Sequence, residues 1–169
     1  IDEFAEDTSI AAVVIRIDSP GGDVAASQEI YDAIVALKKK KKVVVSMGSI
    51  AASGGLLIAC AADKIVANPG TITGSISAIM QFANLEELMK KIGVKSSVIK
   101  SGQYKDIGSP TREMTPEERM IIQELVDDIY NQFVDVIVRD RKLTREQVVA
   151  IGDGRVFTGR KAKEYGLVD

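Results

Sequence analysis

The fold is decided by the stretch from Val43 to Gly55, which reads VVVSMGSIAASGG. Its first part, Val43 to Met47, is an apolar run rich in β-branched residues, as in strands of parallel sheets that are buried on both faces. The small residues that follow lead into a helix expected from about Ser53 to Ala62. A strand that passes through small residues into a helix predicts a strand-to-helix junction of an α/β fold.

The same alternation continues on both sides of this stretch. Apolar periodicity and turn residues predict strands at 12–18, 64–67 and 94–99 and helices at 23–40 and 84–92. The segment 100–111 is irregular, and a capping box then starts a long helix at Thr115. Thr144 and Thr158 cap two short helices, and Leu167-Val168 is strand-like. We therefore predict an α/β fold with a largely parallel sheet, in a single domain that covers residues 1–169.

Composition excludes several classes of function. The chain has 169 residues, 46% of them apolar, and a net charge of −2 without a basic surface pattern, so we expect no binding to nucleic acid. The longest apolar stretch, Ile50 to Ala62, is too short to span a membrane. The sequence contains no histidine and one cysteine, Cys60, which excludes a Ser-His-Asp triad, a Cys-His pair and the usual zinc ligand sets. We predict neither a metal nor a cofactor.

Ser53 is the candidate nucleophile because it stands at the expected junction between strand and helix, among small residues that let a substrate backbone approach. The N–H of Gly54 lies in the first helical turn, where it has no helical acceptor and can stabilise an oxyanion. Gly22 ends the turn after the strand at 12–18, at the same sheet edge, and its N–H is a second candidate donor. The alternative interpretation of 51–55 is a close-packed helix start, and that of the turn at 19–22 is a plain loop.

Without histidine, a serine nucleophile needs another base, and lysine serves when its surroundings lower its pKa. Lys105 is the candidate because it lies in the irregular segment SGQYKDIGSP, whose glycines and proline fix a loop too long for a simple connection. An exposed surface lysine is the alternative interpretation of the same pattern.

Five motifs in fixed order resemble the signal peptide peptidase A family: SPGG at 19–22, MGSIAASGG at 47–55, ADKIVA at 62–67, TGSI at 73–76 and KSGQYKDIGSP at 100–110. The resemblance continues through REMT at 112–115 and DGRVFTG at 153–159, and so covers nearly the whole chain from Ile15. It implies a ClpP/crotonase-like fold with repeated strand-strand-helix units.

The resemblance also implies a role for each site residue. Ser53 matches the nucleophile of the family, Lys105 its general base, and Ser75 the hydroxyl that orients the lysine ammonium. Gly22 and Gly54 match the donors of the oxyanion hole. Two positions depart from the family pattern: Ser77 stands where glycine is common, and Leu56-Leu57 replaces a frequent tyrosine pair.

From the resemblance we expect a serine endopeptidase that degrades remnant signal peptides and other apolar peptides. Leu56, Leu57, Ile76, Ile79 and Met80 suggest an apolar groove for such substrates, and ordinary core residues are the alternative interpretation. A homo-oligomeric ring, expected to be an octamer, would share each Ser-Lys dyad between subunits. The resemblance also implies that the catalytic domain lies on the extracytoplasmic side of the cell membrane, held there by an N-terminal anchor. We expect this anchor and the first strands of the family fold to be missing from this chain, as in a trimmed form. A crotonase-type acyl-CoA enzyme and a non-catalytic assembly module are the alternatives.

Overall fold

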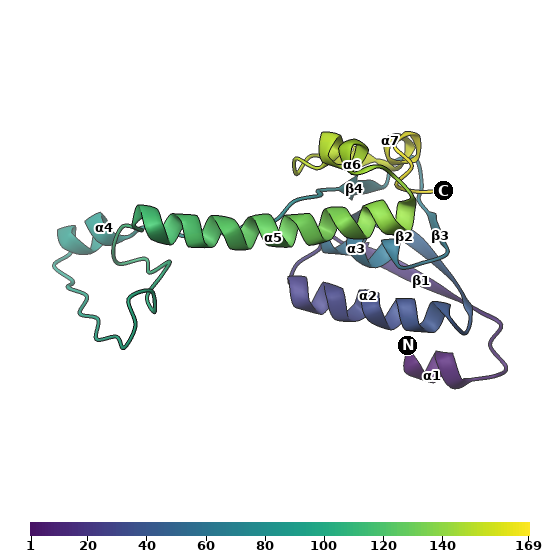
Figure 1. Ribbon diagram of the computed structural model, residues 1–169, viewed down its shortest axis with the longest axis horizontal. Helices are drawn as coiled ribbons and strands as arrows, with labels where there is room; N and C mark the ends of the chain where they lie inside the picture. Colours follow the sequence, from purple (N-terminus) through teal and green to yellow (C-terminus); the bar gives the residue numbers. More distant parts are fainter. The chain divides into compact units, whose positions relative to one another are not determined.

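The computed structural model describes all residues from Ile1 to Asp169, and they form two compact units. Unit 1 comprises Ile1–Ser77 and Ile129–Asp169, and unit 2 comprises Ala78–Asp128. None of the helices combines the length and the apolar character needed to cross a lipid bilayer. Figure 1 shows the elements, which in chain order are α1 (Asp2–Glu6), β1 (Ala12–Ser19), α2 (Val24–Lys38), β2 (Lys42–Ala52), α3 (Gly54–Cys60), β3 (Lys64–Val66), β4 (Ile72–Gly74), α4 (Glu86–Lys91), α5 (Pro116–Arg141), α6 (Arg145–Ile151), β5 (Val156–Thr158) and α7 (Gly159–Glu164).

A five-stranded sheet, centred on β2, organises unit 1. β2 pairs in parallel with β1 on one edge, and with β3 and then β4 on the other. β5 is the exception, because it pairs with β4 in the antiparallel direction. The sheet is therefore largely parallel, as predicted, and the carboxyl ends of β1, β2 and β4 meet at one edge, where ligands bind in folds of this class.

The core of unit 1 lies on one face of this sheet. Val43, Val45 and Met47 of β2 are buried in a cluster with residues of α2, α3 and the second half of α5. α2 and α3 pack against each other and against β2 (Figure 1). On the opposite face Val44 is only half-buried, and Val14 beside it is 69% exposed. The expectation that β2 is buried on both faces is therefore wrong, because no helix of the chain covers the second face.

A bulge in β2, opposite Asp18 of β1, positions the turn that follows β1. Ile17 pairs with Met47 but Ser19 pairs with Ala51, so the register shifts between the two pairs. The Asp18 side chain fills the bulge and accepts a hydrogen bond from the Ile50 N–H at 3.0 Å. The shift brings the end of β1 level with the end of β2, which places the turn at 19–22 beside the β2–α3 junction.

Unit 2 has no hydrophobic core. Every residue of the core cluster belongs to unit 1, and Glu118 is the single buried residue of 78–128. The apolar residues of α5 divide accordingly, with Phe133, Val136 and Ile137 buried but Met120, Ile121 and Leu125 of its first half exposed. The large exposed apolar residues of unit 2 are Ile79, Met80, Phe82, Leu85, Leu88, Ile92, Val94, Val98, Ile99, Tyr104, Met120, Ile121 and Leu125.

Two of the expected strands are absent. The segment 94–99 has strand-like composition but forms no ladder, and neither does Leu167-Val168. The next residue, Asp169, meets β3 with two bonds, since its N–H donates to the Ile65 carbonyl at 2.9 Å and its Oδ2 accepts from the Ile65 N–H at 2.8 Å. A strand needs a partner for its backbone groups, and 94–99 finds none within the chain. The capping box predicted at Thr115 is confirmed, since the Thr115 N–H donates to Glu118 Oε2 at 2.9 Å and the Glu118 N–H to Thr115 Oγ1 at 3.2 Å.

Candidate active site

Ser53 lies at the junction between β2 and α3 in a strained backbone conformation. Its φ of 52° and ψ of −123° fall in a region that residues other than glycine rarely adopt. The Ser53 N–H donates to the Gly74 carbonyl at 2.8 Å, and the Ser53 carbonyl accepts from the N–H groups of Leu56 and Leu57. The side chain does not cap α3, so the hydroxyl is free to react. A sharp, strained strand-to-helix turn is a known way to present a nucleophilic serine.

Two amides lie close to this turn without acceptors. Neither the Gly22 N–H nor the Gly54 N–H donates a hydrogen bond within the chain. Gly21, the residue before Gly22, has a φ of 100° and packs against the junction so closely that an added Cβ would lie 2.7 Å from the Gly54 nitrogen and 2.8 Å from Ser53 Cβ. Unpaired N–H groups beside a nucleophile are what a developing oxyanion requires.

Ser75 is the third feature of the same sheet edge. Ala52 of β2 pairs with Gly74 of β4, and Ser53 and Ser75 are the residues that directly follow these two. Ser75 also has a left-handed backbone, with a φ of 54°, and its N–H donates to the Arg155 carbonyl at 2.8 Å. The two serines therefore lie side by side at the carboxyl end of neighbouring parallel strands.

Lys105 belongs to unit 2, so the structure brings Ser53, Ser75, Gly22 and Gly54 together in unit 1 and holds Lys105 in the other unit. The lysine is exposed and lies in consecutive turns between 101 and 109. Its N–H donates to the Gly102 carbonyl at 3.2 Å, and its ammonium makes no ion pair within the chain. The irregular loop predicted around it is observed.

Cys60, the only cysteine, is not a competing nucleophile. Its side chain is buried in the core, and burial raises the pKa of the thiol to about 12. A thiol at neutral pH then carries almost no thiolate, which is the reactive form. No three His, Cys, Asp or Glu side chains gather closely enough to hold a metal ion.

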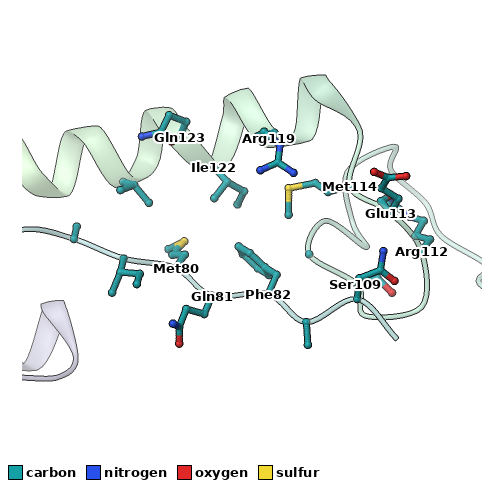
Figure 2. A pocket seen from close by; sticks show the side chains of 16 residues that line it. Met80, Gln81, Phe82, Ser109, Arg112, Glu113, Met114, Arg119, Ile122 and Gln123 are labelled. Atoms are coloured by element: carbon teal, nitrogen blue, oxygen red, sulfur yellow. The ribbon is translucent and has the colours of Figure 1, made fainter. Parts of the chain in front are cut away.

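A hollow of about 960 Å³ is lined entirely by residues of unit 2 (Figure 2). Met80 and Phe82 lie on one side and Ile122 and Arg119 of α5 on the other. The groove expected from sequence needs correction here. Leu56, Leu57 and Ile76 are buried core residues, whereas Ile79 and Met80 are exposed and line this hollow.

Sequence reasoning missed two structural contributions to the site. Gly21 rather than Gly22 makes the close contact with Ser53, and only the fold distinguishes the two neighbours. Asp18 holds the bulge that aligns the two turns, a role without a local sequence signal. The ion network that joins Asp106 and Glu118 to Arg112 in unit 2 has no local sequence signal either.

The family model described as Peptidase family S49 matches residues 35–169 of the chain. A Synechocystis sp. protein, provisionally named as a protease, is 53% identical over 97% of this chain and 59% of its own length. An Enterococcus faecium protein, provisionally named as signal peptide peptidase SppA, is 36% identical over 100% of this chain and 49% of its own. The chain therefore spans only about half to three fifths of these relatives.

The fold resembles that of a ClpP1 variant from Listeria monocytogenes. The TM-score is 0.63 at 21% sequence identity, and the aligned region covers 94% of this chain and 71% of that one. At this identity the likeness establishes the fold alone. The ClpP-like fold expected from the sequence motifs is confirmed.

Proposed function

The chain belongs to peptidase family S49, a family of serine-type peptidases, and we propose that it hydrolyses peptides with Ser53 as nucleophile and Lys105 as general base. The observation that carries the proposal is the strained turn at Ser53 beside two amides without acceptors. Absence of histidine from the sequence favours lysine as the base.

In the proposed reaction, the neutral amine of Lys105 takes the proton of the Ser53 hydroxyl as Oγ attacks the carbonyl carbon of the substrate. The oxyanion accepts hydrogen bonds from the Gly22 and Gly54 N–H groups. When the C–N bond breaks, the Lys105 ammonium gives its proton to the leaving amine and an acyl-enzyme remains. Water, deprotonated by Lys105, then attacks the ester carbonyl carbon. When the ester C–O bond breaks, the Lys105 ammonium returns its proton to Ser53 Oγ and the acid product leaves. The Ser75 hydroxyl orients the lysine.

The substrates we propose are remnant signal peptides and other apolar peptides, cleaved on the extracytoplasmic side of the cell membrane. The name of the Enterococcus faecium relative supports this class. Exposed Ile79, Met80 and Phe82 offer apolar contacts to such a substrate. Digestion of a synthetic signal peptide and of a polar peptide of equal length, followed by mass spectrometry, tests the preference. Equal cleavage of both peptides would contradict it.

We further propose a homo-oligomeric ring, an octamer, in which one subunit supplies Ser53 and its neighbour supplies Lys105. The support is that unit 2 exposes many large apolar side chains and has no core, so a partner surface would stabilise it. The unpaired, strand-like segment 94–99 also has backbone groups free for pairing. Each head-to-tail contact in a closed ring repeats the same shared site.

Two inactive variants test the nucleophile, the base and the sharing together. Ser53→Ala and Lys105→Ala should each abolish hydrolysis of an apolar fluorogenic peptide. After dissociation and mixing in equal amounts, about a quarter of the interfaces should pair an intact Ser53 with an intact Lys105, and activity should return to that extent. Mixed assemblies that form and stay inactive would show that dyads are not shared. Full activity of Ser53→Ala alone would remove Ser53 from the mechanism.

A further inference from the structure

Arg112 lies at the centre of an ion network in unit 2. Its guanidinium binds the Asp106 carboxylate with two hydrogen bonds, from Nε to Oδ2 and from Nη2 to Oδ1, both 2.9 Å long. The same guanidinium reaches Glu118, with Nη1 donating to Oε2 at 2.8 Å and Nη2 donating to Oε1. One arginine therefore joins two carboxylates in the paired geometry that makes such bonds strong and directional.

The network connects the lysine loop to the long helix. Asp106 is the immediate neighbour of Lys105, and Glu118 lies in the first turn of α5, where it also closes the capping box with Thr115. Lys100 completes the network from the other end of the loop, since its Nζ donates to Asp106 Oδ1 at 2.5 Å and to the Gln103 carbonyl at 2.7 Å. Both ends of the segment 100–112 are thus tied to the carboxylate beside Lys105.

These contacts matter more than surface ion pairs usually do. The side chain of Glu118 is 3% exposed and that of Asp106 is 13% exposed, in a unit where no apolar residue is buried. Exposed pairs contribute little because water screens them, whereas networks with bidentate geometry are the recognised exception. The pKa of Asp106 is held well below its usual range by its bonds with Arg112 and Lys100. The shape of the loop therefore depends on ions rather than on packing.

We propose that Arg112 and Asp106 are positioning residues that hold the Lys105 backbone in its catalytic geometry. The proposal rests on the proposed role of Lys105 as general base. Fixing the Asp106 carboxylate fixes the backbone one residue from Lys105, while the lysine side chain itself stays free of ion pairs. Asp106 is already paired with Lys100 and Arg112, so its carboxylate does not draw the Lys105 side chain into an ion pair.

Arg112→Gln is the principal test, with Arg145→Gln as its matched control, because Arg145 makes an ion pair with Asp135 that is confined to unit 1. Active sites are counted with a serine-reactive phosphonate, and kcat and KM are measured per active site. Arg112→Gln should lower kcat by about 10- to 100-fold, the size expected for a catalytic group displaced by about 1 Å, and leave KM within about threefold. Arg112→Lys keeps the positive charge but cannot form the two parallel hydrogen bonds of a guanidinium, so it should recover part of kcat. Arg145→Gln should change neither kcat nor KM.

Amide hydrogen exchange provides a readout that does not depend on catalysis. Exchange across 100–111 should accelerate in Arg112→Gln and stay unchanged in Arg145→Gln. If Arg112→Gln does not fold, Asp106→Asn, which keeps the side-chain volume, replaces it with the same expectations. A normal kcat per active site, or unchanged exchange in the loop, would overturn the proposal. Full activity of Lys105→Ala would instead refute the role of Lys105, and the exchange result would still decide whether Arg112 holds the loop.

Discussion

Replacement of Ser53 by glycine should stabilise the protein while it abolishes catalysis. A non-glycine residue held at a φ of 52° and ψ of −123° carries strain of about 1–3 kcal/mol, which glycine relieves. Glycine also loosens the unfolded chain, which lowers the free energy of unfolding by about 0.4–1 kcal/mol. The net expectation is about 1 kcal/mol in favour of Ser53→Gly over Ser53→Ala, or about 2–4 °C in Tm for a chain of this size.

The comparison between Ser53→Gly and Ser53→Ala removes the hydroxyl from both chains, so only the backbone term differs. Tm is measured by scanning calorimetry at equal protein concentration, because assembly makes Tm depend on concentration. Ser49, an exposed residue of β2 without a positive φ, gives the control, since glycine there should be less stable than alanine. A Ser53→Gly protein that melts below Ser53→Ala would refute the inference that Ser53 is strained.

Two further predictions follow from the same geometry. Gly21→Ala should destroy activity and lower Tm clearly more than Gly93→Ala, because both glycines have positive φ but only Gly21 lacks space for a Cβ; equal effects would contradict the close contact. The hydrogen bond with Arg112 lowers the pKa of Glu118 from 4.5 to about 2. The ionised Glu118 therefore stabilises the folded segment 100–118 above pH 4.5, and this stabilisation is lost as pH falls towards 2. Amide hydrogen exchange in 100–118, corrected for its intrinsic pH dependence, should accelerate over that range, and an unchanged exchange rate would contradict the prediction.

The central strand and its junction are predictable from sequence because their signals are local. Val43 to Met47 is apolar and β-branched, and small residues mark the turn that follows. β4 and β5 have only three residues each and become strands by pairing with residues distant in sequence. The segment 94–99 shows the opposite case, since its composition favours a strand but no neighbour in the chain completes it. A residue's strand propensity therefore produces a strand only where another strand is available to pair with it.

The site divides in the same way. The position of Ser53 at a strand end and the turn at Gly22 are visible as local patterns, whereas the left-handed backbone of Ser53 depends on its bond to Gly74 and appears only in the fold. Two signals distinguish Lys105 among many lysines: the irregular segment around it, which an exposed surface lysine explains as well, and the resemblance of its motif. No local pattern predicts the role of Arg112, because its partners Asp106 and Glu118 are each six residues away, in the loop before it and in the helix after it.

Covalent trapping of the nucleophile decides whether this chain carries a Ser-Lys dyad. The protein is treated with a serine-reactive peptide phosphonate, and the adduct is located and timed by mass spectrometry of the digested chain. A single adduct on Ser53 is predicted, absent from Ser53→Ala and formed at least about 100-fold more slowly in Lys105→Ala, the range that a general base contributes. An adduct on another residue, or labelling of Lys105→Ala at the rate of the unchanged protein, would contradict the dyad.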